Sequence, residues 1–253
     1  MRRLGSLRFA VISDIHGNCF ALDATLQDLR RRDVDQVICL GDTVQGGAQP
    51  DATIERLRKL SCPVVLGNAD AWVLTNANDA EEQVTQQQVD VRSWTLSKLS
   101  PDDLDFLRGY QPTIIVDLDS GRQLLGFHGS PKSYNDILYP DSPQDVWERL
   151  LDPYSPAIMT GGHTHTQQVR RVAEGLFFNP GSVGVVYDYH LPKDQYHTEP
   201  WTEYAILSYG RDQFSLEFRR VPYDVNELAK IIGASGRPHA ESLIAEYQPR
   251  TQH

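Results

Sequence analysis

Residues 9–17 read Phe-Ala-Val-Ile-Ser-Asp-Ile-His-Gly, a short apolar run that ends in a polar turn. The run is rich in Val and Ile without polar alternation, as expected for a parallel strand covered on both faces. Asp14 and His16 follow it at once, and both side-chain types bind metal ions. Gly17 permits a tight turn there. This stretch therefore predicts a buried strand with a candidate ligand site at its carboxyl end.

The rest of the first 70 residues repeats the alternation of apolar runs and amphipathic stretches. Apolar runs predict strands, and stretches with one apolar face predict helices. Strands that alternate with helices indicate an α/β arrangement. The expected order is strand, helix, strand, helix and strand, over residues 9–13, 21–31, 36–40, 51–60 and 64–66.

Residues 70–109 are polar with a helical pattern, and Ser100 is expected to cap a helix that begins at Pro101. We expect a single domain over residues 1–253 with 70–109 as a helical insertion. The positions of later apolar runs indicate a second group of strands and hence two sheets facing each other. These strands are expected at 113–117, 123–127, 157–160, 167–172, 176–178, 203–208 and 214–220.

Four other segments have recognisable turn or loop signals. A helix is expected to open at 142–143, where Ser precedes Pro, and residues 210–213 are expected to form a hairpin turn. Residues 187–200 contain two prolines and predict a surface loop. The tail after Gly233 is predicted to be weakly helical at best.

Composition excludes several classes of protein. The 253 residues include 24 Lys and Arg against 34 Asp and Glu, a formal charge of −10, and 40 % are hydrophobic. We expect a globular protein with no signal peptide and no transmembrane span, because no apolar stretch approaches the required length. The acidic charge lacks the usual driving force for long nucleic acid. Cys19, Cys39 and Cys62 show no Cys-x-x-Cys spacing, which favours a reducing, cytoplasmic location.

Five of the predicted strands are followed by residue types that bind metals, usually beside Gly. The carboxyl ends of strands in α/β folds share one rim, so residues distant in sequence can converge there. Imidazole and carboxylate without thiolate suit Mn, Fe, Co, Ni or Zn, and the number of ligands fits two ions, with Asp42 able to bridge them. The candidate ligands are Asp14, His16, Asp42, Asn68, His128, His163 and His165.

Each of these motifs is common by itself, but all five in this order resemble the calcineurin-like metallophosphoesterase superfamily. The motifs are Asp-x-His, Gly-Asp, Gly-Asn, His and Gly-His-x-His. The resemblance implies a two-layered β-sandwich of mixed sheets flanked by helices, an α/β (α+β) fold. The chain is also similar to the small bacterial and archaeal YfcE-like phosphodiesterases, in segments 34–41, 127–131, 179–184 and 220–224.

The resemblance also implies roles for the candidate ligands. One metal would be held by Asp14, His16 and His165, the other by Asn68, His128 and His163, and Asp42 would bridge them. The implied reaction is hydrolysis of a small phosphodiester or phosphomonoester by a hydroxide that bridges two divalent transition metals, with no assigned catalytic side chain. A nuclease or cyclic-nucleotide phosphodiesterase of the same superfamily and a non-catalytic metal-binding scaffold are the alternatives.

The chain departs from the superfamily pattern at several positions. Many relatives have His after the Gly-Asn pair, but here Ala69 follows, so the acid that protonates the leaving group is unassigned. Asp70 is expected to be structural, for instance as a helix N-cap. Loop residues His190 and His197 are candidates for a replacement acid, although exposed loop histidines are usually only solvated.

Two further positions distinguish the chain from other branches of the superfamily. Gln45 occupies the place of the tyrosine ligand of purple acid phosphatases, and the phosphate-binding arginine of the protein serine/threonine phosphatases is missing near it. Ser182, within Asn-Pro-Gly-Ser-Val-Gly, is expected to fix a turn rather than to contact phosphate. The sequence leaves open the substrate, the metals and the oligomeric state.

Overall fold

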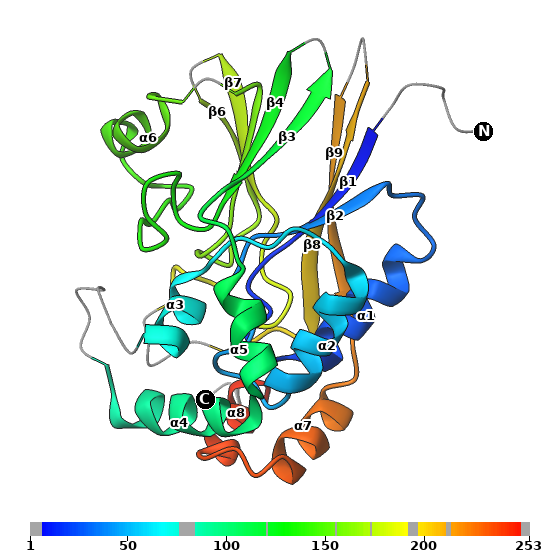
Figure 1. Cartoon of the computed structure of the whole chain (residues 1–253), viewed down its shortest axis with the longest axis vertical. Coiled ribbons are helices and arrows are strands. Elements are labelled where there is room, and N and C mark those ends of the chain that lie inside the picture. Colours follow the sequence, from blue (N-terminus) through cyan, green and yellow to red (C-terminus); the bar gives the residue numbers. More distant parts are fainter. Residues whose placement is uncertain are drawn as a thin grey trace.

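Two mixed β-sheets form the centre of the molecule (Figure 1). The computed structural model describes residues 7–75, 84–119, 121–154, 156–172, 174–191, 197–210 and 214–248. The first sheet has the strand order β2 (Gln36–Cys39), β1 (Leu7–Ile12), β8 (Trp201–Tyr209), β9 (Phe214–Pro222). The second has the order β3 (Ile114–Asp119), β4 (Arg122–Phe127), β5 (Ile158–Gly161), β7 (Gly175–Asn179), β6 (Gln168–Val172).

Both sheets contain parallel and antiparallel pairs: the one parallel pair of the first sheet lies at its β2 edge, and the two parallel pairs of the second sheet lie at its centre. β1 is parallel to β2, and β5 is parallel to both β4 and β7. The pairs β1–β8, β8–β9, β3–β4 and β6–β7 are antiparallel. The carboxyl ends of β1 and β2 therefore lie together at one end of their sheet, as those of β4 and β5 do in the other.

Strand β1 separates two parts of the hydrophobic core. Phe9 and Val11 face the second sheet and pack in one cluster with Phe178 of β7. Ala10 and Ile12 face the opposite way and pack in the cluster that includes helical residues. Because both faces of β1 are buried, its sequence shows no polar alternation.

Helices surround the sheets and gather at the end where the strands β1 and β2 finish (Figure 1). The helix α6 packs its Trp147 against Phe177 of β7 on the second sheet. None of the helices in the described residues is long and apolar enough to cross a membrane. The helices are α1 (Cys19–Leu29), α2 (Pro50–Leu60), α3 (Asn68–Thr75), α4 (Gln86–Lys98), α5 (Pro101–Arg108), α6 (Gln144–Leu151), α7 (Val225–Ala234) and α8 (Ala240–Glu246).

The predicted two-sheet α/β fold is confirmed, and α3, α4 and α5 lie where helices were expected. Ser100 caps α5, since its Oγ accepts a hydrogen bond from the N–H of Asp103 at 3.2 Å. The predicted strand at 64–66 is wrong: Val64 and Val65 make only isolated bridges to Cys39 and Gln111. The antiparallel pair β8–β9 is confirmed, whereas residues 211–213 of the expected hairpin turn lie outside the described residues.

The C-terminal part is more helical than expected. Asp224 caps α7 by accepting hydrogen bonds from the N–H groups of Asn226 and Glu227. Leu228 and Ile232 then recur with helical spacing and pack against Tyr247, which follows α8. The prediction of a weakly helical tail after Gly233 overlooked this second apolar cluster, whose contacts come from two short helices together.

Asp28 joins α1 to the outer strands of the first sheet. Its carboxylate accepts hydrogen bonds from Tyr204 Oη on β8 and from the Arg219 guanidinium on β9, and it pairs with Arg32. Burial opposes the charge, but these three donors outweigh it and lower the pKa of Asp28. The ionised carboxylate is therefore a stabilising contact between helix and sheet.

We expect Asp28→Asn to lower the free energy of unfolding by about 1–3 kcal/mol at pH 7. A carboxyl whose folded pKa is depressed stabilises the fold above its unfolded pKa of about 3.9 and loses that effect as the pH falls through the folded pKa. The difference from the wild type should thus narrow below about pH 4. Urea titrations of both proteins at pH 7 and pH 3 measure this difference in unfolding free energy. Exposed Asp152→Asn is the control, and an equal difference at both pH values would contradict the assignment.

Candidate metal centre

The turns that follow strands in both sheets meet in one place. Asp14 follows β1 and Asp42 follows β2 in the first sheet, while His128 follows β4 and His163 follows β5 in the second. Side chains from these turns form two groups whose ligand-type atoms lie within 4.8 Å of one another. The groups are Asp14, His16 and His165, and Asp42, His128 and His163.

The backbone at these turns is strained. Seven non-glycine residues of the described chain have positive φ, and five of them belong to these two groups: Asp14, His16, Asp42, His163 and His165. Left-handed backbone costs free energy for L-residues and persists where the surrounding structure fixes it, most often at functional sites. The fold therefore holds these side chains in one orientation at an energetic cost.

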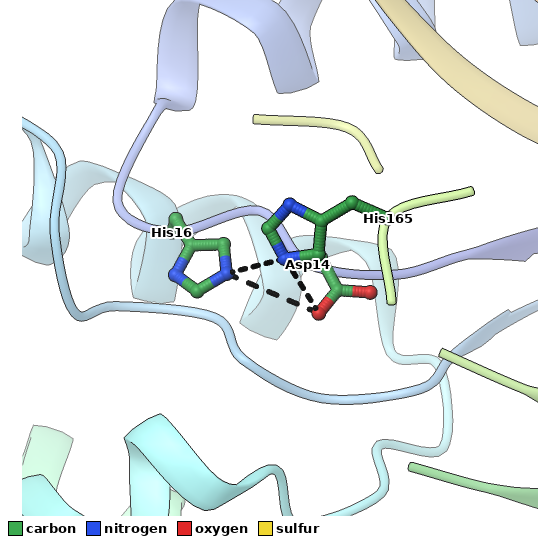
Figure 2. A group of neighbouring side chains, drawn as sticks. All are labelled: Asp14, His16 and His165. Carbon is green, nitrogen blue, oxygen red and sulfur yellow. Dashed lines mark hydrogen bonds and ion pairs between the residues drawn. The ribbon is translucent and has the colours of Figure 1, made fainter. Parts of the chain in front are cut away.

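The first group lies around one carboxylate oxygen (Figure 2). Asp14 Oδ1 is 3.3 Å from His165 Nε2 and 3.9 Å from His16 Nε2, and the two imidazole Nε2 atoms are 3.0 Å apart. Asp14 Oδ1 is buried and accepts no hydrogen bond within the described residues, whereas its Oδ2 accepts one from the N–H of His163. All three side chains thus point at a common centre.

The second group is joined by Asn68, the first residue of α3. Asn68 Oδ1 lies 3.0 Å from His128 Nε2, and the rings of His128 and His163 have centroids 5.0 Å apart. All seven residues selected from the sequence are therefore brought together. Asn68 differs from the others in that its amide oxygen is a neutral ligand.

Asp42 lies between the two groups. Its Oδ2 is 3.7 Å from His16 Nε2 and 3.4 Å from His128 Nε2, while its Oδ1 accepts a hydrogen bond from the N–H of Ala69 at 2.8 Å. A Cβ added at Gly67 would overlap Asp42 Oδ1, so this carboxylate requires glycine beside it. One oxygen of Asp42 thus faces both groups, and the other oxygen holds the side chain in place.

Backbone carbonyls determine the orientation of three imidazoles. The Nδ1 atoms of His16, His128 and His165 face the carbonyl oxygens of residues 45, 40 and 185 at 2.8, 2.7 and 2.6 Å. A carbonyl only accepts, so Nδ1 must donate, and in the neutral ring Nε2 then presents a lone pair. The Nε2 lone pairs of His16 and His165 would repel each other at 3.0 Å unless a cation or a proton lies between them.

The pKa values of these buried groups show how the carboxylates and imidazoles influence one another's charge. Burial disfavours an ionised His128, but the carboxylates of Asp42 and Asp14 outweigh it and raise the pKa of His128 to about 9. Burial and the neighbouring charge of His128 lower the pKa of His163 to about 4. Despite burial, nearby imidazoles hold the pKa of both Asp14 and Asp42 below the usual range. The carboxylates of the cluster thus favour positive charge close to His128, while His163 stays neutral and keeps a lone pair available.

These residues fit divalent transition metals. The donor set combines imidazole nitrogen, carboxylate oxygen and one amide oxygen without thiolate, which suits Mn, Fe, Co, Ni or Zn. The buried Asp14 Oδ1 without a hydrogen bond and the facing Nε2 atoms are the positions where a cation would remove an electrostatic cost.

Asp70 has a structural role that differs from the expected N-cap. Helix α3 already begins at Asn68, and Asp70 Oδ1 accepts hydrogen bonds from the N–H and the Oγ1 of Thr43, both at 2.9 Å. Burial and the nearby Asp42 charge raise the pKa of Asp70 to about 7. The N-cap prediction was wrong because the helix starts two residues earlier, within the metal-ligand motif itself.

Ser182 is buried and fixes a turn, as expected. Its Oγ donates to the carbonyl oxygen of Asp14 at 2.8 Å and accepts from the N–H of Val185 at 2.9 Å. Val185 in turn supplies the carbonyl that orients His165. Ser182 therefore joins the turn after β7 to the ligand turn after β1.

A cleft of about 1380 Å³ opens over the cluster. It is lined by ligand residues together with Ala69, Trp72 and Lys132, and also by Arg237. Neither His190 nor His197 lines it: the ring of His190 lies tilted against that of Tyr189, and His197 Nε2 lies 3.1 Å from a carboxylate oxygen of Glu199. Sequence reasoning missed Arg237, because no pattern links it to motifs that end at residue 165.

Comparison with known proteins agrees with this geometry. The model of the calcineurin-like phosphoesterase superfamily domain matches residues 7–198. An uncharacterized protein of Methanocaldococcus jannaschii is 31 % identical over 235 residues, which cover 86 % of this chain and 88 % of the relative. The chain therefore belongs to the calcineurin-like phosphoesterase superfamily, a group of phosphoesterase hydrolases that use divalent metals.

Solved structures share the fold. A metallophosphoesterase from Sphaerobacter thermophilus is similar with a TM-score of 0.71 and 25 % identity, covering 95 % of this chain and 97 % of the other. A hypothetical protein from Pyrococcus horikoshii OT3 has a TM-score of 0.75 at 20 % identity, with coverage of 97 % and 100 %, and shows likeness of fold alone.

Loss of the Ser182 hydroxyl should weaken the turn that supports Asp14 and His165. We expect Ser182→Ala to lower the free energy of unfolding by about 1–3 kcal/mol, because the partly buried N–H of Val185 and the buried carbonyl of Asp14 each lose a hydrogen-bond partner. Chemical denaturation measures the change. Ser93→Ala, an exposed serine on α4 whose Oγ also bonds a backbone carbonyl, should change it by less than about 0.5 kcal/mol, and equal effects of the two variants would contradict the assigned role.

Proposed function

We propose that the chain is a metal-dependent hydrolase of small phosphodiesters or phosphomonoesters that uses two divalent transition metals. The observation on which this depends is the position of Asp42 Oδ2, which faces His16 of one group and His128 of the other. Asp14, His16 and His165 would hold the first ion, Asn68, His128 and His163 the second, and Asp42 both. Two such ions would supply a water of lowered pKa and neutralise charge on phosphoryl oxygens.

The chain's own residues prepare the site for this chemistry. Carbonyls hold each Nδ1 proton of His16, His128 and His165, so the opposite nitrogens stay available as ligands without a change of tautomer. Strained turns keep the ligands in place before anything binds. Little reorganisation is therefore needed during the reaction, which is the main source of electrostatic catalysis.

The open cleft and the charge of the chain support a small anionic substrate. Lys132 and Arg237 line the cleft and would offset the acidic residues around it for a phosphoryl group. The formal charge of −10 opposes long nucleic acid, whose binding depends on many cationic contacts. We infer no membrane partner, and a cytoplasmic location is supported by the three free cysteines.

Ala69 limits which leaving groups the proposed enzyme can release efficiently. It lines the cleft directly after the ligand Asn68, and its methyl group can neither donate nor accept a proton. Alkoxide leaving groups need a proton in the transition state, whereas nitrophenolate does not. The proposed enzyme therefore favours aryl esters with acidic leaving groups.

Metal content and diester hydrolysis test the proposal together. We expect two ions per chain by elemental analysis and cleavage of bis(p-nitrophenyl) phosphate that is lost with a chelator and restored by Mn²⁺. Asp42→Asn should reduce the rate by at least about 100-fold, since loss of even an outer ligand contact costs 10–100-fold. Asp152→Asn serves as the control. Two tightly bound ions without cleavage of any ester would favour the scaffold alternative, and absence of bound metal would contradict the proposal.

The dependence on the leaving group tests the role assigned to Ala69. Rates on a series of methyl aryl phosphates should fall steeply as the leaving phenol becomes more basic. Ala69→His should raise the rates of the most basic leaving groups by about 10²-fold or more and flatten the dependence, because a general acid is restored. Ala69→Gln, of similar size but unable to titrate, should not. A flat dependence in the wild type would show that another acid is present.

A further inference from the structure

Arg237 lies in the turn between α7 and α8, far in sequence from every ligand motif, yet its side chain is only 8 % exposed. Its Nε donates to the carbonyl oxygen of Gly46 at 2.7 Å. Its Nη1 donates to the carbonyl oxygens of Pro238 and His239 at 2.9 and 3.1 Å. The guanidinium is thus held rigidly by three neutral acceptors.

This guanidinium lies beside the candidate metal centre. His16 Nδ1 is bound by the carbonyl of Gln45, and Arg237 Nε is bound by the carbonyl of the next residue, Gly46. These two carbonyls belong to consecutive residues, whose Cα atoms are about 3.8 Å apart. The imidazole of His16 and the guanidinium of Arg237 are therefore held by neighbouring peptide groups of one loop. Arg237 is therefore placed by the same loop that places a candidate ligand.

Arg237 also lies at the boundary between two cavities. His16, Gly46 and Arg237 line both the large cleft over the cluster and a smaller cavity of about 240 Å³. The walls of the smaller cavity include Leu228 and Ile232 of α7 and Leu243 of α8. Its lining is mainly apolar, and its volume suits a group of one or two rings rather than a whole large ligand.

The charge of Arg237 has no close counter-ion in the described residues. No carboxylate oxygen there lies within ion-pair distance of it, and Glu246, which also lines the small cavity, acts only at longer range. Burial lowers the pKa of Arg237, since the charged form has lost water. A buried guanidinium without an anion is costly, and its Nη2, which has no carbonyl acceptor among the described residues, is available to donate to a phosphoryl oxygen.

We propose that Arg237 binds a phosphoryl oxygen of the substrate and that the small cavity takes a neutral, aromatic or other apolar ester group of the same molecule. This inference rests on the proposed function and specifies its substrate class as phosphodiesters with one such group. Glu246 makes a second negative charge in the cavity unfavourable, which excludes a polyphosphate chain there.

Binding of two non-hydrolysable probes tests this inference. Calorimetry on the full-length, metal-loaded protein compares phenylphosphonate with methylphosphonate. The phenyl probe should bind at least about tenfold more tightly, because its ring is removed from water in the small cavity. Arg237→Gln should weaken the binding of both probes by about tenfold or more, and Arg237→Lys, which retains the charge but not the carbonyl contacts that position it, should weaken binding less.

A cavity-filling variant separates the two parts of the subsite. Leu243→Trp should weaken phenylphosphonate and leave methylphosphonate unchanged, because only the ring needs the cavity. Arg149→Gln, on the exposed surface of α6, is the matched control and should change neither affinity. If Arg237→Gln does not fold, Arg237→Lys and Leu243→Trp decide the outcome.

The outcomes distinguish this inference from the proposed function. Unchanged affinities in the Arg237 variants, with or without a lower melting temperature, would show that Arg237 only holds backbone carbonyls and would overturn the inference. That result together with metal-dependent ester cleavage would leave the proposed function intact. The expected pattern of phosphonate binding without hydrolysis of any ester would support the subsite and overturn the proposed function.

Discussion

The two sheets are joined at Asp14. Its N–H donates to the carbonyl of Gly41 in the turn after β2, and its carbonyl accepts from Ser182 Oγ and from the N–H of Gly184 in the turn after β7. Its Oδ2 accepts from the N–H of His163 after β5. One buried residue thus connects turns of both sheets, and its positive φ is the backbone conformation that lets it do so.

This junction brings several ionisable groups together in one buried space. Their burial is tolerated because carboxylates lie next to imidazoles rather than next to one another. Each carboxylate faces imidazoles, so the pKa of Asp42 stays low while the pKa of His128 is raised to about 9. The carbonyls that bind Nδ1 atoms add negative potential on the outer side of the rings. A cation at this site would replace protons that the carboxylates attract.

The C-terminal helices α7 and α8 contribute to the surroundings of the site. They lie beyond residues 7–198, the part matched by the family model, and pack their own apolar cluster beside the cleft. The turn between them is attached to α4 through the hydrogen bond between His239 Nε2 and a carboxylate oxygen of Asp90, at 2.8 Å. Two segments outside the ligand motifs, α4 and the α7–α8 pair, thereby border the site.

The sequence by itself determined the α/β class, most of the strands and all seven residues that converge, because these depend on local apolar runs and on short motifs at strand ends. It did not determine that Val64 and Val65 would form isolated β-bridges rather than a strand, since strand pairing depends on which segments the fold places beside them. Nor could it place Asp70 of α3 against Thr43 in the turn after β2, a contact between residues 27 positions apart. Only the tertiary structure brought Arg237 beside His16, because that proximity arises from packing between distant segments and has no sequence period or spacing to reveal it.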